Sequence, residues 1–557
     1  MGNTVTAQAS PLNVGDLVAR FLQAIKTEVV FGIISVHNIP VMDGIARAGG
    51  MRVVMTRGEM GAAHMADAYA RRSGKLGVLI SSTGPGAANA VPGLLEASFA
   101  STPLLHITGQ VPRKFLGRDT GATHNVRDQL GMLKSVCKAA LRIDDASQAA
   151  AVLARAASLA LTAPMGPVSV EIPIDVQKLP AAIPAEWAAA SPLQIPELPR
   201  ASDADIEKLA ALVKSAKRPM LWAGKGAAGC RASLRQLLDM GFGMVTSWAG
   251  RGVIPEDHPM NLGGLNGTGA PEVTQFYQSV DLMLVIGSRV RGQETVDQTI
   301  PLPARRAQID IDPAANGRSY GCELFIHGQA QDTLERLLAR LGGQYRAESG
   351  YAEQFAAMKH QARQAFARTL GPYESFAAQL RAQLPRNAIW ARDITVANST
   401  WGNRLFEIYE PRDALHPVGA GIGLGFPLGI GAALAANGAK TVVLTGDAGF
   451  VLNIGELWTA VQEKLDLLVI VMNDAGYGVI KHMQDASFGG RRVYGDLMPP
   501  DFKALAHTAG MAYARVDKPG DFGPAVARLA AARGLALVEV NMLAIGEAPP
   551  YFPYQKS

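Results

Sequence analysis

Cysteine is scarce in this chain of 557 residues, which contains only Cys137, Cys230 and Cys322. The three lie far apart and form no CxxC pair. The sequence therefore excludes the disulfide framework of small secreted proteins and predicts a reducing, cytoplasmic compartment. No uncharged apolar run of about 18 residues occurs, and the N-terminus lacks a basic segment followed by an apolar core. We expect neither a membrane span nor a secretory signal.

A concentrated excess of positive charge is also absent. The formal net charge is +5, and no basic tract is interleaved with aromatic residues, which argues against a nucleic-acid partner. Hydrophobic residues make up 48% of the chain and charged residues 18%, a balance typical of a compact globular protein with large internal or intersubunit surfaces. The chain is too long for one hydrophobic core, so the sequence predicts several domains.

Strand and helix patterns alternate along the chain, which predicts an α/β fold of three domains, each a mainly parallel sheet flanked by helices. A segment rich in Pro and Ala separates the first two domains and is typical of a semi-rigid linker. An aromatic, Pro-rich tail is expected either to cover a site as a lid or to pack on a partner subunit. The expected order is a first domain at 1–182, a linker at 183–202, a second domain at 203–342, a helical connection at 343–374, a third domain at 375–545 and the tail at 546–557.

Two strand-like runs of apolar, β-branched residues end in an acidic residue. KTVVLTGD ends at Asp447, and LDLLVIVMND ends at Asp474. Because the carboxyl ends of parallel strands meet at one edge of a sheet, the two carboxylates are expected close together in a ligand crevice. With the main-chain carbonyl of Gly476 they offer the oxygen ligands that Mg²⁺ takes. The alternative is an ordinary βαβ unit that has acidic residues at its strand ends.

The residues after Asp447 are suited to phosphate. Ala448 and Gly449 let backbone N–H groups approach an anion, and NIGELWTAV is predicted to open a helix whose N-terminus favours negative charge. The spacing of GDA and ND resembles the signature of thiamine diphosphate enzymes, in which Asn is commoner at the position of Asp474. An Asp there still ligates Mg²⁺. The resemblance implies thiamine diphosphate and Mg²⁺ as cofactors, with cofactor contacts from Gly446, Ala448, Gly449, Tyr477, Gly478 and Val479.

A second segment, VVMTRGEMGAAHMADAYARRSG, resembles the catalytic-glutamate region of acetolactate synthase and its relatives. The resemblance implies that Glu59 protonates the aminopyrimidine ring of the cofactor, although the His that commonly precedes this Glu is Gly58 here. A solvated glutamate that stabilises the dipole at a helix start is the alternative. The next segment resembles the same family: Gly84 and Pro85 form a tight turn at a strand end, and Asn89 is expected in the first turn of the following helix.

The glycine-rich run HPVGAGIGLGFPLGIGAALA resembles the part of the family that contacts the thiamine rings. Ile422 falls at the position of the aliphatic residue that bends the cofactor, and the Ala420 carbonyl at that of the acceptor for the pyrimidine amino group. Close packing of a glycine-rich helix on its neighbour is the alternative, and both can hold together. By resemblance, Asn398 and Ser399 in the predicted strand-end loop DITVANST face the diphosphate.

The second domain contains a loose GxGxxG motif, AGKGAAG, directly after the strand PMLWA. Such a motif is weak evidence alone. Arg289 and Arg291, at another strand end, could neutralise a nucleotide diphosphate. Resemblance to acetolactate synthase places a structural FAD in this domain, while relatives keep the fold with ADP or with no nucleotide, and the sequence leaves these outcomes open.

The resemblance covers nearly the whole chain and is nearest to acetolactate synthase. It implies an enzyme that decarboxylates a 2-oxo acid and ligates the resulting enamine to a second carbonyl, in a homodimer or dimer of dimers whose active site forms between subunits. Pocket positions differ, however: Gly121 to His124 replace a Phe-Gln-Glu run, and Met483 replaces a Trp. The alternative is a non-oxidative 2-oxo acid decarboxylase or an acyloin lyase resembling benzaldehyde lyase, with 2-oxo acids or aldehydes as substrates.

Three further residues are candidates for catalysis. His37 follows a predicted strand at a position where benzaldehyde lyase and some decarboxylases resemble this chain in carrying a histidine. Because an ordinary histidine titrates near about 6.5, this side chain could relay protons. A loop histidine that caps backbone groups is the alternative. His124 is a second candidate, and Gln110 matches a family glutamine near the active centre.

Overall fold

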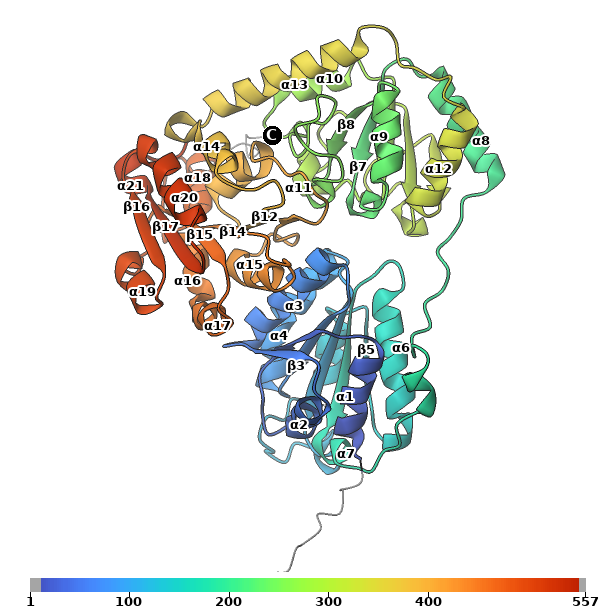
Figure 1. Ribbon diagram of the computed structural model, residues 1–557, viewed down its shortest axis with the longest axis vertical. Coiled ribbons are helices and arrows are strands. Elements are labelled where there is room, and N and C mark those ends of the chain that lie inside the picture. The colour runs from blue at the N-terminus through green and yellow to red at the C-terminus, as the bar shows by residue number, and fades with distance from the viewer. Residues whose placement is uncertain (1–11, 550–557) are drawn as a thin grey trace, which may run out of the picture. The chain divides into compact units, whose positions relative to one another are not determined.

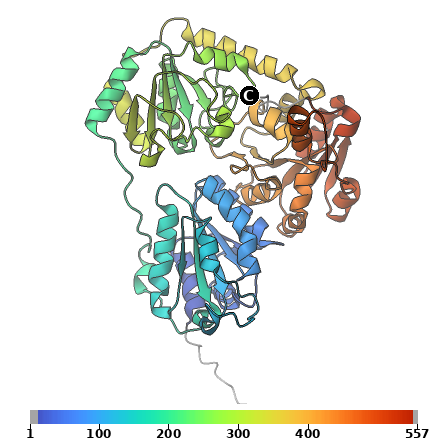
Figure 2. The same ribbon diagram turned by 180° about the vertical axis from the view of Figure 1, so that it is seen from behind.

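The computed structural model describes residues 12–549, which form two compact units, one extending to Pro196 and one beginning at Glu197. The division falls within the segment 183–202 that the sequence predicts to be a linker. In both units, parallel sheets are covered by helices on both faces, as views from opposite sides show (Figure 1 and Figure 2). Residues 550–557, most of the predicted tail 546–557, lie outside the described residues, so the role of the tail stays a prediction.

The first unit contains a six-stranded parallel sheet flanked by helices. Its strands are β1 (Val29–Gly32), β2 (Arg52–Met55), β3 (Gly77–Ser81), β4 (Leu104–Gln110), β5 (Ala139–Arg142) and β6 (Pro167–Pro173), and its helices are α1 (Val14–Ala24), α2 (Ile39–Ala48), α3 (Glu59–Ser73), α4 (Pro85–Phe99), α5 (Gln129–Lys134), α6 (Ala149–Leu161) and α7 (Ile174–Gln177). The strand order is β2-β1-β3-β4-β6-β5. The central strands β3, β4 and β6 are buried along their whole length, because helices cover both faces of the sheet.

Helices α3 and α4 approach each other closely. A Cβ atom added to Gly93 of α4 would lie 2.3 Å from the Cβ of Ala63 in α3, so this position requires glycine. The close pairing holds the N-terminal end of α3, where Glu59 lies, near the N-terminal end of α4.

The second unit begins with a five-stranded parallel sheet in the middle of the chain. Its strands are β7 (Pro219–Ala223), β8 (Gly243–Thr246), β9 (Leu282–Ile286), β10 (Arg306–Asp310) and β11 (Leu324–His327), and its helices are α8 (Asp203–Ser215), α9 (Arg231–Asp239), α10 (Pro271–Tyr277), α11 (Gly292–Thr295) and α12 (Ala330–Leu341). The strand order is β11-β10-β9-β7-β8. A long helix, α13 (Tyr351–Arg368), follows in the segment predicted to be a helical connection.

The same unit ends with a six-stranded parallel sheet. Its strands are β12 (Ile389–Arg392), β13 (Ala414–Leu415), β14 (Thr441–Gly446), β15 (Leu467–Asn473), β16 (Ala512–Val516) and β17 (Leu535–Asn541), and its helices are α14 (Phe376–Ala382), α15 (Gly425–Leu434), α16 (Asp447–Leu452), α17 (Leu457–Gln462), α18 (Gly478–Ser487), α19 (Phe502–Thr508), α20 (Phe522–Ala530) and α21 (Met542–Ile545). The strand order, β13-β12-β14-β15-β17-β16, repeats that of the first sheet position by position.

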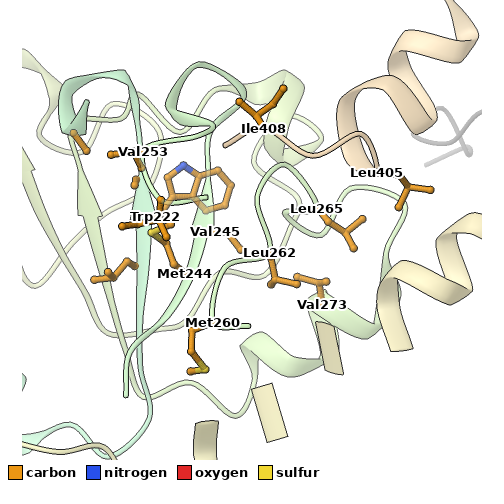
Figure 3. Packing of buried hydrophobic residues seen from close by; sticks show 14 of the residues in the cluster. Trp222, Met244, Val245, Val253, Met260, Leu262, Leu265, Val273, Leu405 and Ile408 are labelled. Atoms are coloured by element: carbon orange, nitrogen blue, oxygen red, sulfur yellow. The ribbon is translucent and has the colours of Figure 1, made fainter. Parts of the chain in front are cut away.

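The two sheets of the second unit share one hydrophobic core. Figure 3 shows Trp222 and Val245 from the middle sheet close to Ile408, which belongs to the last part of the chain. A buried ion pair between Arg251 and Glu256 joins the same regions, because Glu256 also accepts a hydrogen bond of 2.9 Å from the Ile408 backbone N–H. Continuous packing explains why residues from Glu197 onward form one compact unit.

These sheets confirm the predicted α/β fold of mainly parallel sheets flanked by helices. All neighbouring strands in the three sheets run parallel. No helix within residues 12–549 combines the length and apolar character that crossing a membrane requires.

Candidate active site

Two acidic residues lie at the carboxyl ends of neighbouring strands in the last sheet. Asp447 follows β14, Asp474 follows β15, and these strands pair up to Gly446 opposite Met472. The helix predicted within NIGELWTAV is present, as a short turn at Ile454–Glu456 followed by α17 at Leu457–Gln462, and a further helix that the sequence analysis did not predict, α16, begins at Asp447 itself. Gly446 is an extended cap residue there, and an acidic residue in the first turn is favoured by the helix dipole.

Asp447 is buried, and Asp474 beside it is half-buried. Asp447 is 1% exposed, and neither of its carboxylate oxygens has a hydrogen-bond partner among the described residues. Burial and the neighbouring charge of Asp447 raise the pKa of Asp474 to about 7. Burial also raises the pKa of Asp447. Buried carboxylates are costly unless they are paired or ligate a cation, so this arrangement suits a divalent metal ion.

The ligand set favours an ion that takes further oxygen ligands from elsewhere. Within residues 12–549 there is no group of three or more His, Cys, Asp or Glu side chains arranged to hold a metal. Asp447 and Asp474 therefore supply two carboxylates, and the rest of the shell would come from backbone carbonyls, phosphate or water, as Mg²⁺ prefers. The predicted third ligand, Gly476, follows Asp474 closely and forms an isolated bridge with Asp496.

Two glycines in the loop after β15, Gly476 and Gly478, lie where a side chain would not fit. A Cβ atom on Gly478 would lie 2.0 Å from Oδ2 of Asp474, and one on Gly476 would lie 2.1 Å from the Gly495 carbonyl oxygen. The Tyr477 N–H donates to the same Gly495 carbonyl at 2.8 Å. Gly478 and Val479 then open α18. Of the predicted cofactor contacts Tyr477, Gly478 and Val479, Gly478 thus lies directly against the Asp474 carboxylate, and the other two are its neighbours in the chain.

The glycine-rich segment 416–425 lies against the C-terminal end of α16. Ala420 adopts a left-handed backbone conformation with φ of 61°, and Ile422 is 39% exposed, as a side chain that meets a ligand would be. Asn453, at the end of α16, donates through Nδ2 to the Gly423 carbonyl at 2.7 Å. A Cβ on Gly423 would lie 2.8 Å from the Cβ of Leu452. The segment is therefore held directly against α16.

Asp393 is a residue of this region that the sequence prediction omits. It follows β12 and is fully buried, and burial raises its pKa. Its carboxylate accepts hydrogen bonds from the N–H groups of Gly423, at 2.9 Å, and Gly425, at 3.2 Å. The signal was present, because Asp393 ends an apolar strand in the same way as Asp447 does.

The structure corrects the predicted loop around Asn398 and Ser399. The segment is helical, with a wide turn at Asn398–Gly402, because Thr395 and Thr400 hydrogen-bond the surrounding backbone. Asn398 is buried, and its Nδ2 donates to the Leu444 carbonyl of β14 at 2.8 Å. The role of both residues at a diphosphate stays a prediction.

In the first unit, Glu59 is the first residue of α3 and is only 8% exposed. The solvated glutamate considered as an alternative is therefore wrong. Asn89 Nδ2 lies 3.4 Å from one carboxylate oxygen, and a Cβ on Gly86 would lie 2.7 Å from the other. Asn89 is in the second turn of α4 rather than the first, since the helix begins at Pro85. The structure brings Glu59 together with Gly86 and Asn89 of the segment after the Gly84 turn.

A buried hydrogen-bond network supports the turn at Gly84. Oε1 of Gln129 accepts from the Gly84 N–H at 2.7 Å and from the Thr83 hydroxyl at 2.8 Å. Oε1 of Gln110 also accepts from Thr83, at 3.1 Å, while its Nε2 donates to Glu171 at 3.3 Å. With both ends engaged, Gln110 is placed to position the turn. Gln129 and Glu171 were missed, because neither lies in a recognisable motif.

The two candidate histidines lie side by side at the same turn. The ring centroids of His37 and His124 are 5.2 Å apart, and His37 Nδ1 is buried without a hydrogen-bond partner among the described residues. Burial and the neighbouring His124 lower the pKa of His37. A Cβ on Gly84 would lie 2.2 Å from the His124 carbonyl oxygen, which places the pair at the predicted turn. Two adjacent imidazoles of this kind can exchange and donate protons.

The glycines of AGKGAAG have a packing role in the middle sheet. A Cβ on Gly224 would lie 2.2 Å from the Gly287 carbonyl oxygen, and one on Gly226 would lie 2.8 Å from the Gly287 Cα. The loops that follow β7 and β9 therefore require these two glycines in order to meet. Bound FAD or ADP in this domain stays a prediction, since packing alone accounts for the motif.

Comparison with known proteins gives the same order of domains. Family models match residues 12–132 (thiamine pyrophosphate enzyme, N-terminal TPP binding domain), 206–337 (thiamine pyrophosphate enzyme, central domain) and 395–540 (thiamine pyrophosphate enzyme, C-terminal TPP binding domain). Thiamine pyrophosphate is the same compound as thiamine diphosphate.

Curated relatives match most of the chain. A probable 2-ketoarginine decarboxylase of Pseudomonas aeruginosa is 34% identical over 477 residues, which cover 84% of this chain and 83% of the relative. A probable acetolactate synthase large subunit of Methanococcus aeolicus is 29% identical, with 92% and 89% covered. The acetolactate synthase isozyme 1 large subunit of Escherichia coli is 28% identical, with 97% and 95% covered.

Proposed function

We propose a reaction from one premise: this chain belongs to the thiamine pyrophosphate enzyme family. With thiamine diphosphate and Mg²⁺, it decarboxylates a 2-oxo acid and joins the remaining carbon unit to a second carbonyl compound. The acetolactate synthases among its relatives support this reading through their near-complete coverage of the chain.

The observation that carries the proposal is the acidic pair of buried Asp447 and half-buried Asp474. Asp447 has two carboxylate oxygens with no partner in residues 12–549, and it lies beside Asp474 at the carboxyl edge of a parallel sheet. A Mg²⁺ ion held by these carboxylates would offset their negative charge and leave positions for diphosphate oxygens. Ala448 and Gly449 follow in the first turn of α16, where small residues let backbone N–H groups approach an anion.

Separate residues of the chain serve the cofactor's chemistry, its proton and its rings. Bound thiamine diphosphate supplies the electron sink for loss of CO₂ from the 2-oxo acid. Glu59 holds a proton for the aminopyrimidine ring, and Asn89 orients its carboxylate. Ile422 would contact the rings of the bound cofactor, and the Ala420 carbonyl would accept a hydrogen bond from its amino group, so that the reacting groups are held close together. Burial of Glu59 keeps water away from that proton.

A second candidate function is supported by the histidine pair. His37 and His124 form a proton-donating pair at the Gly84 turn, and protonation of the decarboxylated unit releases an aldehyde instead of a ligated product. The similarity to a probable 2-ketoarginine decarboxylase agrees with this outcome. Non-oxidative decarboxylation or acyloin cleavage is therefore the alternative.

The subunit arrangement is part of the proposal. Glu59 and the acidic pair belong to different compact units of the chain, and in the family the two halves of a cofactor site come from different subunits. We expect a homodimer or a dimer of dimers, with FAD or ADP as an optional occupant of the middle domain.

The test is a product analysis. Purified protein is incubated with thiamine diphosphate, Mg²⁺ and a panel of 2-oxo acids, with and without acceptor aldehydes, and CO₂ and carbon-carbon products are measured. Ligated product supports the first candidate, and free aldehyde supports the second. No turnover with any 2-oxo acid or acyloin, together with no calorimetric uptake of the cofactor, would overturn both. Absorbance of the purified protein reports bound flavin.

A further inference from the structure

We propose that Asp393 is a positioning residue. It fixes the glycine-rich segment 416–425 to the end of β14, the strand that Asp447 follows. This inference rests on the proposed function in one respect only, namely that segment 416–425 contacts the thiamine rings. The clamp itself is a property of the chain and is present before any cofactor binds.

The carboxylate of Asp393 is fully engaged. Its Oδ1 accepts from the N–H of Ile394 at 2.7 Å and of Gly423 at 2.9 Å. Its Oδ2 accepts from the N–H of Gly425 at 3.2 Å and from the Thr445 hydroxyl at 3.1 Å. Because ionised acceptors form the stronger hydrogen bonds in a buried setting, four donors on one carboxylate make a rigid junction.

Three elements meet at the Asp393 side chain, because two of the residues that contact it are glycines without a Cβ atom. A Cβ on Gly425, the first residue of α15, would lie 2.7 Å from the Cβ of Asp393. A Cβ on Gly449 of α16 would lie 2.9 Å from its Oδ2. The junction therefore joins β12, the start of α15 and the start of α16, and it leaves no space for a longer acidic side chain.

The position of Gly423 is fixed from both sides. Its N–H is bound by Asp393 and its carbonyl by Asn453. With φ of 87° the residue turns the chain so that Ile422 remains partly exposed beside α16. Ala420, which holds a sparsely populated left-handed conformation, lies three residues earlier. The clamp thus presets Ile422, which is predicted to bend the cofactor, and Ala420, whose carbonyl is predicted to accept a hydrogen bond from it.

The first test measures hydrogen exchange in the metal-free, cofactor-free protein. Asp393→Asn keeps the size of the side chain but places an amide N–H₂ group against the N–H of Gly425 or Gly423, so at least one accepting contact becomes a repulsive one. We expect the amides of Gly423 and Gly425 to exchange at least ~10-fold faster than in the wild type. Thr445→Val removes one donor of the four and should give a smaller acceleration.

A matched control separates this effect from general destabilisation. Glu256→Gln alters another buried carboxylate of the same unit, one that binds Arg251 and the Ile408 N–H and has no hydrogen bond to segment 416–425. It should leave exchange at Gly423 and Gly425 within about 2-fold of the wild type. Equal acceleration in both variants, or no acceleration in Asp393→Asn, would overturn the proposal. If Asp393→Asn does not fold, Thr445→Val decides the question by the same readout.

A second readout concerns the cofactor. Asp393→Asn should raise the thiamine diphosphate concentration for half-maximal activity at least ~10-fold, with a smaller change in kcat at saturation, because a mobile segment must be ordered on binding. A merely structural defect would lower thermal stability without this split. If the wild type takes up no cofactor, the proposed function fails while the exchange result still decides the clamp.

Discussion

The first and last sheets of the chain share one strand order, yet they treat their acidic residues differently. Beside the first sheet, Glu59 has Asn89 within 3.4 Å of its carboxylate. In the last sheet, neither carboxylate oxygen of Asp447 has a partner within residues 12–549. The same arrangement of strands can therefore serve two purposes. A hydrogen-bond donor beside the carboxylate suits proton transfer, and a carboxylate without donors suits a cation.

The largest effect on activity is expected from Asp447→Asn. Loss of a charged ligand should reduce turnover at least ~10³-fold, because the cation and the diphosphate bind together. In metal-free protein the same variant should be more stable than the wild type by about 1 kcal/mol, since an unpaired buried carboxylate is removed. Calorimetric titration with thiamine diphosphate and Mg²⁺, and urea unfolding in a chelator, measure the two. Unchanged cofactor affinity in Asp447→Asn would contradict the role of Asp447 as a ligand of the cation.

Glu59→Gln should separate chemistry from binding. The amide is nearly isosteric but cannot exchange the proton, so turnover should fall by about 10²- to 10⁴-fold while cofactor affinity and thermal stability stay close to those of the wild type. Glu28→Gln is the matched control, because Glu28 has an exposed side chain that pairs with Lys75 at the surface of the same unit. A parallel loss of affinity and turnover in Glu59→Gln would assign this residue to binding instead.

Two glycine substitutions test the acidic residues of the two sheets separately. Gly478→Ala places a Cβ 2.0 Å from Asp474, and Gly86→Ala places one 2.7 Å from Glu59. Each should cost about 1–3 kcal/mol of unfolding free energy, but only Gly478→Ala should also weaken Mg²⁺ binding. Gly520→Ala, where no atom lies within 4 Å, should change stability by less than about 0.5 kcal/mol. Urea unfolding with and without Mg²⁺ distinguishes them, and equal Mg²⁺ affinity in both site variants would count against the metal role of Asp474.

The smallest expected effect is a pH dependence of stability. In metal-free protein the pKa of Asp474 is raised to about 7, whereas an unfolded Asp titrates near about 3.9. The folded state therefore binds more protons between these values, and the stability that this group contributes below about pH 4 is lost as pH rises through about 7. Asp474→Asn should diminish this slope and leave only the part that Asp447 contributes, because burial raises the pKa of Asp447 as well.

Thermal unfolding of wild type and Asp474→Asn across that pH range, in a chelator, gives the difference curve that isolates Asp474. Added Mg²⁺ should diminish the slope in the wild type, because the cation favours the ionised pair. Parallel curves for the two proteins would contradict the raised pKa.

The sequence predicted the fold and the grouping of the main residues because apolar strands and their ends can be recognised from the sequence alone. Apolar β-branched runs ending in an acid located Asp447 and Asp474 correctly at neighbouring strand ends. The sequence could not predict the partners of Gln110, because Gln129 and Glu171 approach it only after the sheet has formed. It also missed Asp393, whose role depends on contacts with Gly423 and Gly425 about thirty positions later. The loop predicted at Asn398 failed because side-chain hydrogen bonds stabilise a helical turn there.

The parallel arrangement of all neighbouring strands in the three sheets has a consequence for handling the protein. Parallel neighbours cannot be joined by a hairpin, so each strand reaches its partner only after a crossover of a dozen or more residues has formed. Chains dominated by such distant pairings fold slowly and expose apolar strands meanwhile. We expect recovery after denaturation to be slow and to fall steeply with protein concentration, and production at low temperature to improve the yield of native enzyme.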